Sequence, residues 1–373
     1  MPPDSLIYTN PPVLTARARQ LSFADAETPW WQPERHADRR PALLTRARIE
    51  RAARQYLENE GFLLVDVPGL QVSPGNETHL HAFATEAIGN DGVGHRMYLH
   101  TSPEFTLKKL LAAGESRIAS LQHVWRNRER SALHHPEFTM LEWYRKAEPY
   151  EAVIADVIAL LRLAAKTAGT PMLRYRGRAA EVALEPERVS VVDAFRKHAG
   201  IDLFATMDER GETDAGALAD AMRRVGLKVP ATFTWSLLFS LILTERVEPH
   251  LGIGRITVLD QYPAAEAALA RRVAGDPRVA ERFEVYAAGV ELANGFGELT
   301  DPVEQRLRFT AEMDEKARLY GERYPIDEAL LAALPLIGEA SGVALGFDRV
   351  VMLAVGAPRL TDVLWAPVAE VDQ

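Results

Sequence analysis

The stretch RNRERSALHHPEFTMLEWYRK, Arg126 to Lys146, ends like a buried strand but carries polar groups where core side chains are expected. Successive side chains of a strand point to opposite sides. Four residues therefore share one face: Phe138, Met140, Glu142 and Tyr144. A face that begins apolar and ends in a carboxylate and a phenol is unusual for plain core, which raises the question of what these polar groups meet.

The composition of the 373-residue chain is close to that of an average globular protein, with 47% hydrophobic and 25% charged residues. This length suffices for one large domain or two ordinary ones. No stretch has the long uncharged apolar run of a membrane span, and the N-terminus lacks the pattern of a secretory signal. The absence of cysteine excludes disulfides, thiolate metal sites and a cysteine nucleophile. We therefore expect a cytoplasmic protein without a membrane partner.

The net charge of −9, from 43 basic and 52 acidic residues, provides no general field that would attract nucleic acid. Basic residues do concentrate in two places, Arg17–Arg54 and Arg126–Arg130. We interpret the first cluster as a solvated face. The charge balance thus counts mildly against an RNA partner.

The chain changes composition at about residue 45. Residues 1–44 are rich in Pro, Arg and Asp, and we predict that they form an extended arm. Residues 45–373 are predicted to form one domain, with a helical insertion around 170–255.

Within this domain the pattern predicts a helix over 45–61, a strand over 62–68 and a further helix starting near Ser102. Residues 282–296 are predicted to form a hairpin that turns at 287–289. Strands separated by helices but joined through hairpins predict an α+β fold with a mainly antiparallel sheet.

Three separate segments place polar groups where core is expected. Besides Arg126–Tyr144 they are GVELANGFGELTD, residues 289–301, and GVALGFDR, residues 342–349. The guanidinium group of arginine is a planar fork that matches a phosphate. Two arginines from distant segments, such as Arg126 and Arg349, therefore suit two phosphates of one nucleotide.

Two carboxylates of the second segment, Glu291 and Glu298, are seven residues apart and flank a predicted turn at Asn294. Such a pair suits Mg²⁺, which takes one or two protein carboxylates plus phosphate oxygens. Gly342 and Gly346 would let the backbone approach a flat or phosphorylated ligand. Together the segments predict a nucleotide–Mg²⁺ site with carboxylates left for a cationic group. Taken singly, each charged residue also fits a purely structural buried ion pair.

A second interpretation of HHPE is a zinc site built from His134, His135 and Glu137. Pro136 lies among these ligands and no second cluster supplies further ones, so zinc is the weaker hypothesis. The chain has neither the phosphate-binding loop G-x-x-x-x-G-K-[ST] nor the G-x-S-x-G elbow of serine hydrolases.

The three segments resemble the signature motifs of class II aminoacyl-tRNA synthetases. RNRERSALHHPEFTMLEWY resembles motif 2, GVALGFDRVVML resembles motif 3, and FLLVDVPGL resembles motif 1. TSPEF and ELANGFGELTD are closest to the lysyl subgroup. The resemblance extends from about Thr45 to the C-terminus in the right order. It implies the catalytic fold of that class, which commonly forms homodimers through its motif 1 helix.

Lysyl-tRNA synthetases carry an anticodon-binding domain before this core, but only 44 residues precede Thr45 here, near the ~40-residue floor for independent folding. A lysyl-type core without that domain resembles the elongation factor P–(R)-β-lysine ligase family. Ala344 agrees with this, because lysyl-tRNA synthetases usually have glycine there, whereas these ligases resemble this chain in having alanine. One methyl group in a pocket is worth about 1–3 kcal/mol, enough to disfavour α-lysine against an isomer whose amine sits one carbon away.

The resemblance implies a function for each motif residue. It places the amino-acid substrate against Ser102, Pro103, Glu104, Glu142, Tyr144, Asn294 and Glu298. It places ATP against Arg126, Asn127, Arg128, His135, Glu291, Leu292, Gly346 and Arg349, with Arg126 on the α-phosphate and Arg349 on the terminal phosphate. Glu291 and Glu298 are the Mg²⁺ candidates, and Ala344 would set specificity. The polar groups of the strand that contains Glu142 and Tyr144 would thus contact lysine and ATP.

Two positions depart from the usual motif 2. The motif usually reads Arg-x-Glu, with the glutamate accepting the adenine amine, whereas this chain has Arg128 and places Glu129 one residue later. Arginine cannot accept that hydrogen bond, so the adenine contact would come from a backbone carbonyl, from Glu129 or from stacking on Arg128. His135 stands where asparagine is frequent.

The resemblance implies adenylate chemistry. The carboxylate of (R)-β-lysine would attack the α-phosphorus of ATP, pyrophosphate would leave, and the acyl group would pass to a lysine ε-amine of elongation factor P. Expected partners are therefore ATP, Mg²⁺, (R)-β-lysine, elongation factor P and a second copy of the chain, without tRNA. Two alternatives stay open: a truncated lysyl-tRNA synthetase that charges tRNA, and a catalytically inactive regulatory paralogue.

Overall fold

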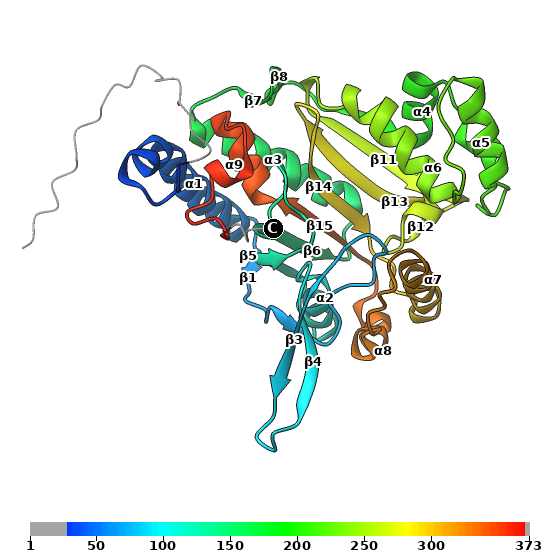
Figure 1. The fold of residues 1–373 in the computed structure, drawn as a ribbon, viewed down its shortest axis with the longest axis horizontal. Coiled ribbons are helices and arrows are strands. Elements are labelled where there is room, and N and C mark those ends of the chain that lie inside the picture. Colours follow the sequence, from blue (N-terminus) through cyan, green and yellow to red (C-terminus); the bar gives the residue numbers. More distant parts are fainter. Residues whose placement is uncertain (1–27, 370–373) are drawn as a thin grey trace, which may run out of the picture.

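A computed structural model describes residues 28–369. Its centre is a nine-stranded sheet in the order β1-β5-β6-β15-β14-β13-β11-β9, with β12 paired to β13 (Figure 1). The β1–β5 and β11–β9 pairs are parallel and the others are antiparallel, which confirms the predicted α+β fold. The strands are β1 (Leu63–Leu64), β5 (Arg117–Trp125), β6 (Glu137–Lys146), β9 (Glu187–Ser190), β11 (Thr257–Pro263), β12 (Arg272–Val273), β13 (Asp276–Ala287), β14 (Val290–Gly297) and β15 (Ala340–Gly346).

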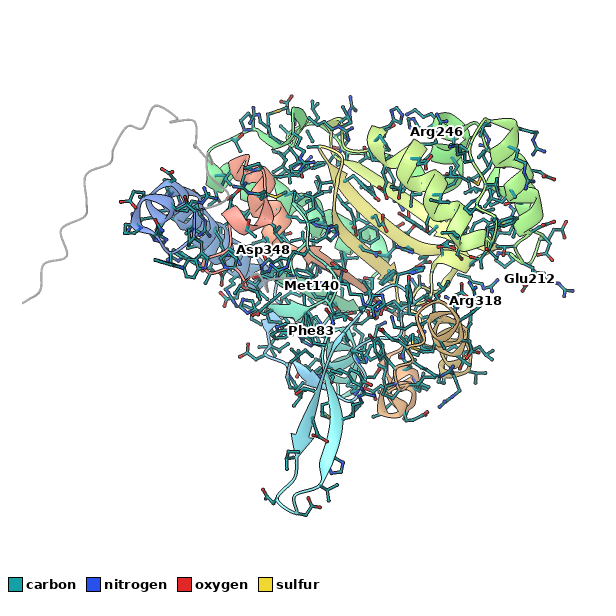
Figure 2. The ribbon with its side chains drawn as sticks, in the orientation of Figure 1. Phe83, Met140, Glu212, Arg246, Arg318 and Asp348 are labelled. Carbon is teal, nitrogen blue, oxygen red and sulfur yellow. The ribbon has the colours of Figure 1, made fainter. Side chains whose placement is uncertain are left out.

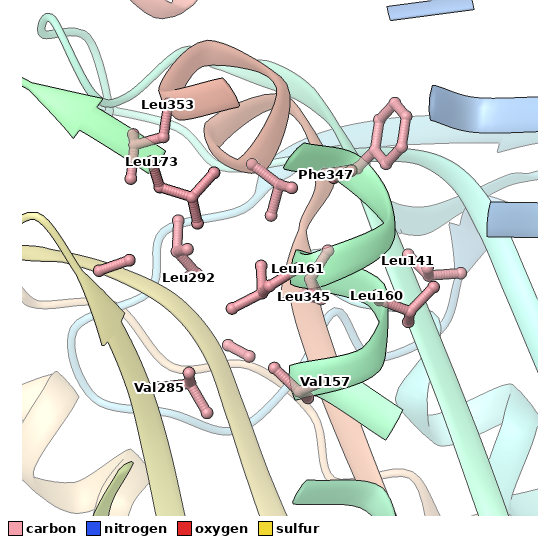
Figure 3. Packing of buried hydrophobic residues seen from close by; sticks show 14 of the residues in the cluster. Leu141, Val157, Leu160, Leu161, Leu173, Val285, Leu292, Leu345, Phe347 and Leu353 are labelled. Atoms are coloured by element: carbon pink, nitrogen blue, oxygen red, sulfur yellow. The ribbon is translucent and has the colours of Figure 1, made fainter. Parts of the chain in front are cut away.

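One face of the sheet is covered by α3 (Tyr150–Ala168), which packs beside α9 (Phe347–Val355). Gly169 ends α3 in the left-handed conformation at φ 75°. The apolar stripe of the helix meets apolar strand residues, as Figure 3 shows for Leu161 and Leu345. Because alternate strand residues point into this core, the intervening ones point to the opposite face of the sheet.

The helix α1 (Pro33–Asn59) corrects the predicted arm. Residues 33–44, predicted to be extended, form its first turns. Proline is compatible with a helix start at Pro33, because the first helical N–H has no partner within the helix in any case. The arginines of this part of the cluster are not all solvated: Arg35 Nη2 lies 2.6 Å from the buried Asp362 Oδ1. Residues 1–27 of the predicted arm lie outside the described residues.

The motif 1 strand is also shorter than predicted. Of residues 62–68 only β1 forms a ladder, because Pro68 has no N–H to donate and the chain turns away before it. The helix predicted near Ser102 is α2 (Glu104–Ala112), with Pro103 as its N-cap. The predicted hairpin is confirmed, since β13 and β14 are joined at residues 288–289.

A second group of elements lies at one end of the sheet. Helices α7 (Pro302–Tyr320) and α8 (Glu328–Ile337) pack together, and α8 packs on α2. A small sheet, formed by β2 (Leu70–Gln71), β3 (Phe83–Ile88) and β4 (Gly94–Leu99), extends away from the body as a hairpin (Figure 1). Over residues 28–369, no helix is long and apolar enough to cross a membrane.

The insertion around 170–255 is only partly helical. Its three helices are α4 (Val191–Ala199), α5 (Ala215–Arg224) and α6 (Trp235–Ile242), which share a separate apolar core. The stretch before them also contains strands. β9 joins the central sheet, and β8 (Arg178–Glu181) lies between β7 (Met172–Tyr175) and β10 (Gly254–Arg255) in a small three-stranded sheet. Figure 1 shows that the three helices of this insertion lie on the β11–β13 side of the sheet.

Candidate active site

The sheet face opposite α3 forms the floor of a cavity of about 1150 Å³. Three central strands contribute to this floor: Met140 on β6, Ala344 on β15 and Asn294 on β14. The side walls include residues of α6 and α7. Figure 2 shows the cavity-lining residues Met140 and Asp348 close to the middle of the molecule, where β6 contacts α9.

Strand register brings polar residues of distant segments into one row across the floor. Glu142 on β6 pairs with Ala344 on β15, and Ala344 pairs with Asn294 on β14. Asn294 in turn pairs with Glu284 on β13. Paired residues of neighbouring strands point to the same side of the sheet. Ala344, the predicted specificity residue, therefore lies between Glu142 and Asn294.

Gly342 is required for the packing next to this row. A Cβ atom there would lie 2.3 Å from Tyr144 Cε1 and 2.5 Å from Glu298 Oε1, far inside van der Waals contact. The glycine was predicted to admit a ligand to the backbone. The structure gives it a different function, because it makes room for two side chains of the protein.

Lys108 of α2 lies at the centre of a buried cluster of charges. Its Nζ is 2.5 Å from Glu104 Oε1 and 2.7 Å from Glu298 Oε2. Burial lowers the pKa of Lys108, but the two carboxylates outweigh this and hold its pKa above the ordinary value. Burial raises the pKa of Glu298 to about 7, although Lys108 opposes the shift. Two glutamates expected around the substrate are thus bridged by a lysine of the protein itself.

Glu142 is held by two hydroxyl groups beside this cluster. Ser102 Oγ donates to Glu142 Oε2 at 2.6 Å, and the Tyr144 hydroxyl donates to Oε1 at 2.6 Å. Burial, followed by the Glu104 carboxylate, raises the pKa of Glu142 to about 8. Ser102 and Asn294 line the cavity, whereas Glu142, Tyr144 and the Lys108 cluster do not border it.

Arg349 occupies the other end of the cavity. Its Nη1 donates to the Glu291 carbonyl at 3.0 Å and lies 3.3 Å from Glu291 Oε2, while Nη2 lies 2.9 Å from His134 Nε2. Burial raises the pKa of Glu291, and the neighbouring Glu284 carboxylate adds to the shift. Repulsion between these two carboxylates favours a cation at this position.

The predicted Mg²⁺ pair is not brought together. Asn294 and Gly295 continue β14 instead of forming a turn. At about 3.3 Å per residue, Glu291 and Glu298 are roughly 20 Å apart along the strand. Glu298 is occupied by Lys108, and the carboxylate that interacts with Glu291 is Glu284.

The zinc interpretation is not supported. Residues 28–369 contain no group of three or more His, Cys, Asp or Glu side chains with the geometry of a metal site. His134 contacts Arg349, and His135 Nδ1 lies 2.6 Å from the Glu137 carbonyl, which makes Nδ1 the protonated nitrogen. Burial lowers the pKa of His135, so the ring is neutral at pH 7. A Mg²⁺ site needs fewer protein ligands, and Glu284 and Glu291 are carboxylates of the kind it prefers. Glu284 accepts from Arg282 Nη2 at 2.7 Å and from the Tyr286 hydroxyl at 2.6 Å, so binding Mg²⁺ would require it to exchange these contacts.

The motif 2 loop separates its residues. Arg126 borders the cavity, with its guanidinium carbon 5.3 Å from the centre of the Phe138 ring. Asn127 pairs with the backbone of His81, outside the cavity lining. Arg128 adopts a positive φ of 65° and forms an ion pair with Glu322, also away from the cavity.

Three other predicted residues occupy the nucleotide end. His135 and Gly346 border the cavity, and Gly346 immediately precedes α9. Leu292 also borders it, but its side chain belongs to the α3 core, as Figure 3 shows. Glu129 lines the cavity and Arg128 does not. Of the three adenine contacts considered, this geometry favours Glu129 over stacking on Arg128.

Sequence reasoning missed two residues around the site, Lys108 and Glu284, and considered His134 only as a zinc ligand. Lys108 follows Glu104 by four residues, a helical spacing that signals an ion pair. Glu284 lies directly opposite Asn294 in the predicted hairpin, so the hairpin register could have identified it.

A mainly antiparallel sheet whose cavity is lined by Arg126 and Arg349 from distant segments agrees with the catalytic domain of a class II aminoacyl-tRNA synthetase. The family of class II tRNA synthetases (D, K and N) matches residues 26–370. Three similar proteins bear the name elongation factor P–(R)-β-lysine ligase. Those of Klebsiella pneumoniae subsp. pneumoniae and Pectobacterium carotovorum subsp. carotovorum are each 38% identical over 343 residues, covering 91% of this chain and 98% of the relative. That of Proteus mirabilis is 36% identical over 345 residues, covering 91% and 97%. This chain belongs to the elongation factor P–(R)-β-lysine ligase family.

Proposed function

We propose that this protein is an ATP-dependent ligase that activates (R)-β-lysine as an adenylate and transfers the acyl group to a lysine side chain of elongation factor P. One observation carries the proposal: a single cavity is lined by Arg126 and Arg349 and also by Ser102 and Ala344, which lie next to the buried Glu142. The arginines suit a nucleoside triphosphate, and the region beside the buried carboxylates suits an amine-bearing acid. The similarity to the ligases named above covers 91% of this chain.

At the nucleotide end, Arg126 would bind the α-phosphate and Arg349 the terminal phosphate. To do so, Arg349 exchanges its contact with Glu291 for a phosphate oxygen. Glu284 and Glu291 would hold Mg²⁺, which neutralises phosphate charge when bound. The residues position the carboxylate of the amino acid in line with the leaving pyrophosphate, and no covalent bond to the protein is required.

At the amino-acid end, the substrate ammonium group would bind near Glu298 and Glu142. Glu298 Oε1 is buried and has no hydrogen-bond partner among residues 28–369. A buried acceptor without a partner costs free energy, which a bound ammonium group would remove. Asn294 and Ala344 would contact the chain between the amine and the carboxylate.

We further propose that the protein acts in the cytoplasm as a homodimer and does not charge tRNA. A truncated lysyl-tRNA synthetase is less favoured, because the relatives that match along the chain are named as ligases. An inactive regulatory paralogue is less favoured because Arg126, Glu291 and Arg349 are all retained and gathered at one cavity.

ATP–pyrophosphate exchange, run with (R)-β-lysine, (S)-β-lysine and α-lysine in parallel, tests the proposed function. We expect strong exchange with (R)-β-lysine and weak exchange with α-lysine. Dominant exchange with α-lysine would favour the truncated synthetase. No exchange with any isomer would contradict adenylate chemistry and favour the inactive paralogue.

Substitution Ala344→Gly should relax the choice between lysine isomers. Removing the methyl group between Glu142 and Asn294 enlarges the floor by one carbon. One methyl group in a pocket contributes about 1–3 kcal/mol of discrimination between substrates. Its removal should therefore raise the ratio of exchange with α-lysine to exchange with (R)-β-lysine by roughly 5- to 150-fold. The ratio is measured within one variant, so a general loss of activity cancels. An unchanged ratio would show that Ala344 does not set specificity.

A further inference from the structure

The segment 76–82 borders the cavity and is attached to α7 along its length. Lys316 Nζ donates to the carbonyls of Thr78 and Leu80 at 2.9 and 2.6 Å. The Thr78 amide donates to Glu312 Oε2 at 2.9 Å. The lysine is fully buried and the amide is paired, so this segment is a rigid support.

Glu77, which belongs to this segment, lines a charged corner of the cavity. Four charged groups face it: Glu104 from α2, Arg126 from the end of β5, and Glu312 and Lys316 from α7. Burial, followed by the Glu104 carboxylate, raises the pKa of Glu77 to about 7, while Arg126 opposes the shift. The mechanism described above gives this residue no function.

Other cavity carboxylates already have partners. Glu291 contacts Arg349, Glu315 pairs with Arg318 at 2.6 Å, and Glu312 accepts from Thr78. In contrast, no side chain within residues 28–369 donates a hydrogen bond to the carboxylate of Glu77, which accepts one from its own backbone amide. Its charge interaction with Arg126 places it beside the residue proposed to hold the α-phosphate, where the acyl adenylate would form.

We propose that Glu77 is the catalytic base of the acyl-transfer step and accepts the proton that the attacking lysine amine must lose. This inference rests on the proposed function. The acceptor amine reaches the acyl carbon in its neutral form, after its ammonium proton has passed to water. Its lone pair forms the C–N bond, and the bond from the acyl carbon to the phosphate oxygen breaks. AMP leaves with that electron pair, and the extra proton on nitrogen passes to the Glu77 carboxylate.

Two half-reactions separate this function from adenylate formation. For Glu77→Gln, we expect ATP–pyrophosphate exchange with (R)-β-lysine to stay within about 3-fold of wild type. Single-turnover transfer from preformed adenylate to elongation factor P should slow by about 100-fold or more, the usual contribution of a general base. Glutamine is a neutral isostere of protonated glutamate, so the substitution leaves the packing of the corner intact. The matched control is Glu315→Gln, which should leave both half-reactions unchanged.

The pH dependence of transfer supplies a second readout. Below about pH 7 both the amine and Glu77 must lose a proton, so the logarithm of the wild-type rate should rise with a slope of two. Above pH 7 only the amine still titrates, and the slope should fall to one. Glu77→Gln should give a slope of one throughout.

Three outcomes decide the matter. Slow transfer with normal exchange, together with loss of the bend near pH 7, supports the inference. Unchanged transfer in Glu77→Gln, or equal loss of both half-reactions, overturns it. If the wild-type protein itself shows no exchange, the proposed function fails, and the inference fails with it.

Discussion

Replacing Lys108 with methionine is expected to abolish adenylate formation and to lower the free energy of unfolding by about 3–5 kcal/mol. Methionine retains the length of the side chain but removes the charge that bridges Glu104 and Glu298. Three buried carboxylates, including Glu142, would then lie together without a cation. They can stay buried only by taking up protons, and protonated carboxyls bind a substrate ammonium group poorly. Exchange with (R)-β-lysine should fall by at least about 100-fold.

The pH dependence of this variant follows from the raised pKa values of its carboxylates. Glu298 already has a pKa of about 7 with Lys108 present, and losing the lysine raises it further. At pH 5 the buried carboxyls are protonated and lower the free energy of unfolding little. As pH rises, the unfolded chain ionises them freely while burial resists their ionisation in the folded protein, so the free energy of unfolding falls. Urea unfolding should therefore show the smallest difference from wild type at pH 5 and the largest at pH 8.

Lys109→Met is the matched control. Lys109 lies next in the chain and pairs with Asp327 at 2.5 Å, but its side chain is 31% exposed. Removing a partly exposed charge should lower the free energy of unfolding much less. Lys109 also does not pair with Glu104 or Glu298, the glutamates that Lys108 bridges. Equal effects of the two substitutions on exchange would contradict the proposed importance of the Lys108 cluster.

The second large effect is expected for Asp348→Ala, which should lower the free energy of unfolding by about 3–5 kcal/mol. Asp348 accepts a hydrogen bond from the buried Arg46 of α1 and, at 2.7 Å, from the backbone amide of Thr139 on β6. Arg46 Nη2 also donates to Thr139 Oγ1 at 2.7 Å. The substitution would leave Arg46 buried without a counter-charge and the amide without an acceptor.

The same substitution should weaken nucleotide binding. Asp348 precedes Arg349 and fixes the first turn of α9 against β6 (Figure 2). Loosening this turn displaces the guanidinium group proposed to hold the terminal phosphate, so KM for ATP should rise while KM for (R)-β-lysine changes little. Asp314→Ala removes an exposed ion pair with Arg323 and serves as the control. Wild-type stability and an unchanged KM for ATP in Asp348→Ala would contradict this account.

Much of the fold and part of the site could be predicted from local patterns. The alternation of Phe138, Met140, Glu142 and Tyr144 predicted a strand with a polar face, and the structure contains it as β6. The hairpin over 282–296 and the helix that starts near Ser102 also follow from local spacing. These features depend on periodicity and turn chemistry within a few residues.

Predictions failed where distant residues decide local structure. Residues 33–44 contain Pro41 and many arginines, which suggested an extended arm, yet they are helical. Arg35 and Arg39 find acceptors around Asp362 and Thr361, more than 300 residues further along the chain. No local pattern encodes such a partner.

The sequence by itself determined the order of the motifs, the strand periodicity and the chemical types available at the site. Only the tertiary structure decided which charges meet. Glu298 was predicted to share a cation with Glu291, but the straight course of β14 separates the two and places Glu298 on Lys108. Arg128 lies within motif 2 and yet pairs with Glu322 outside the cavity. The physical reason is that pairing of buried charges depends on distance and desolvation in three dimensions, and neither quantity is a property of a short stretch of sequence.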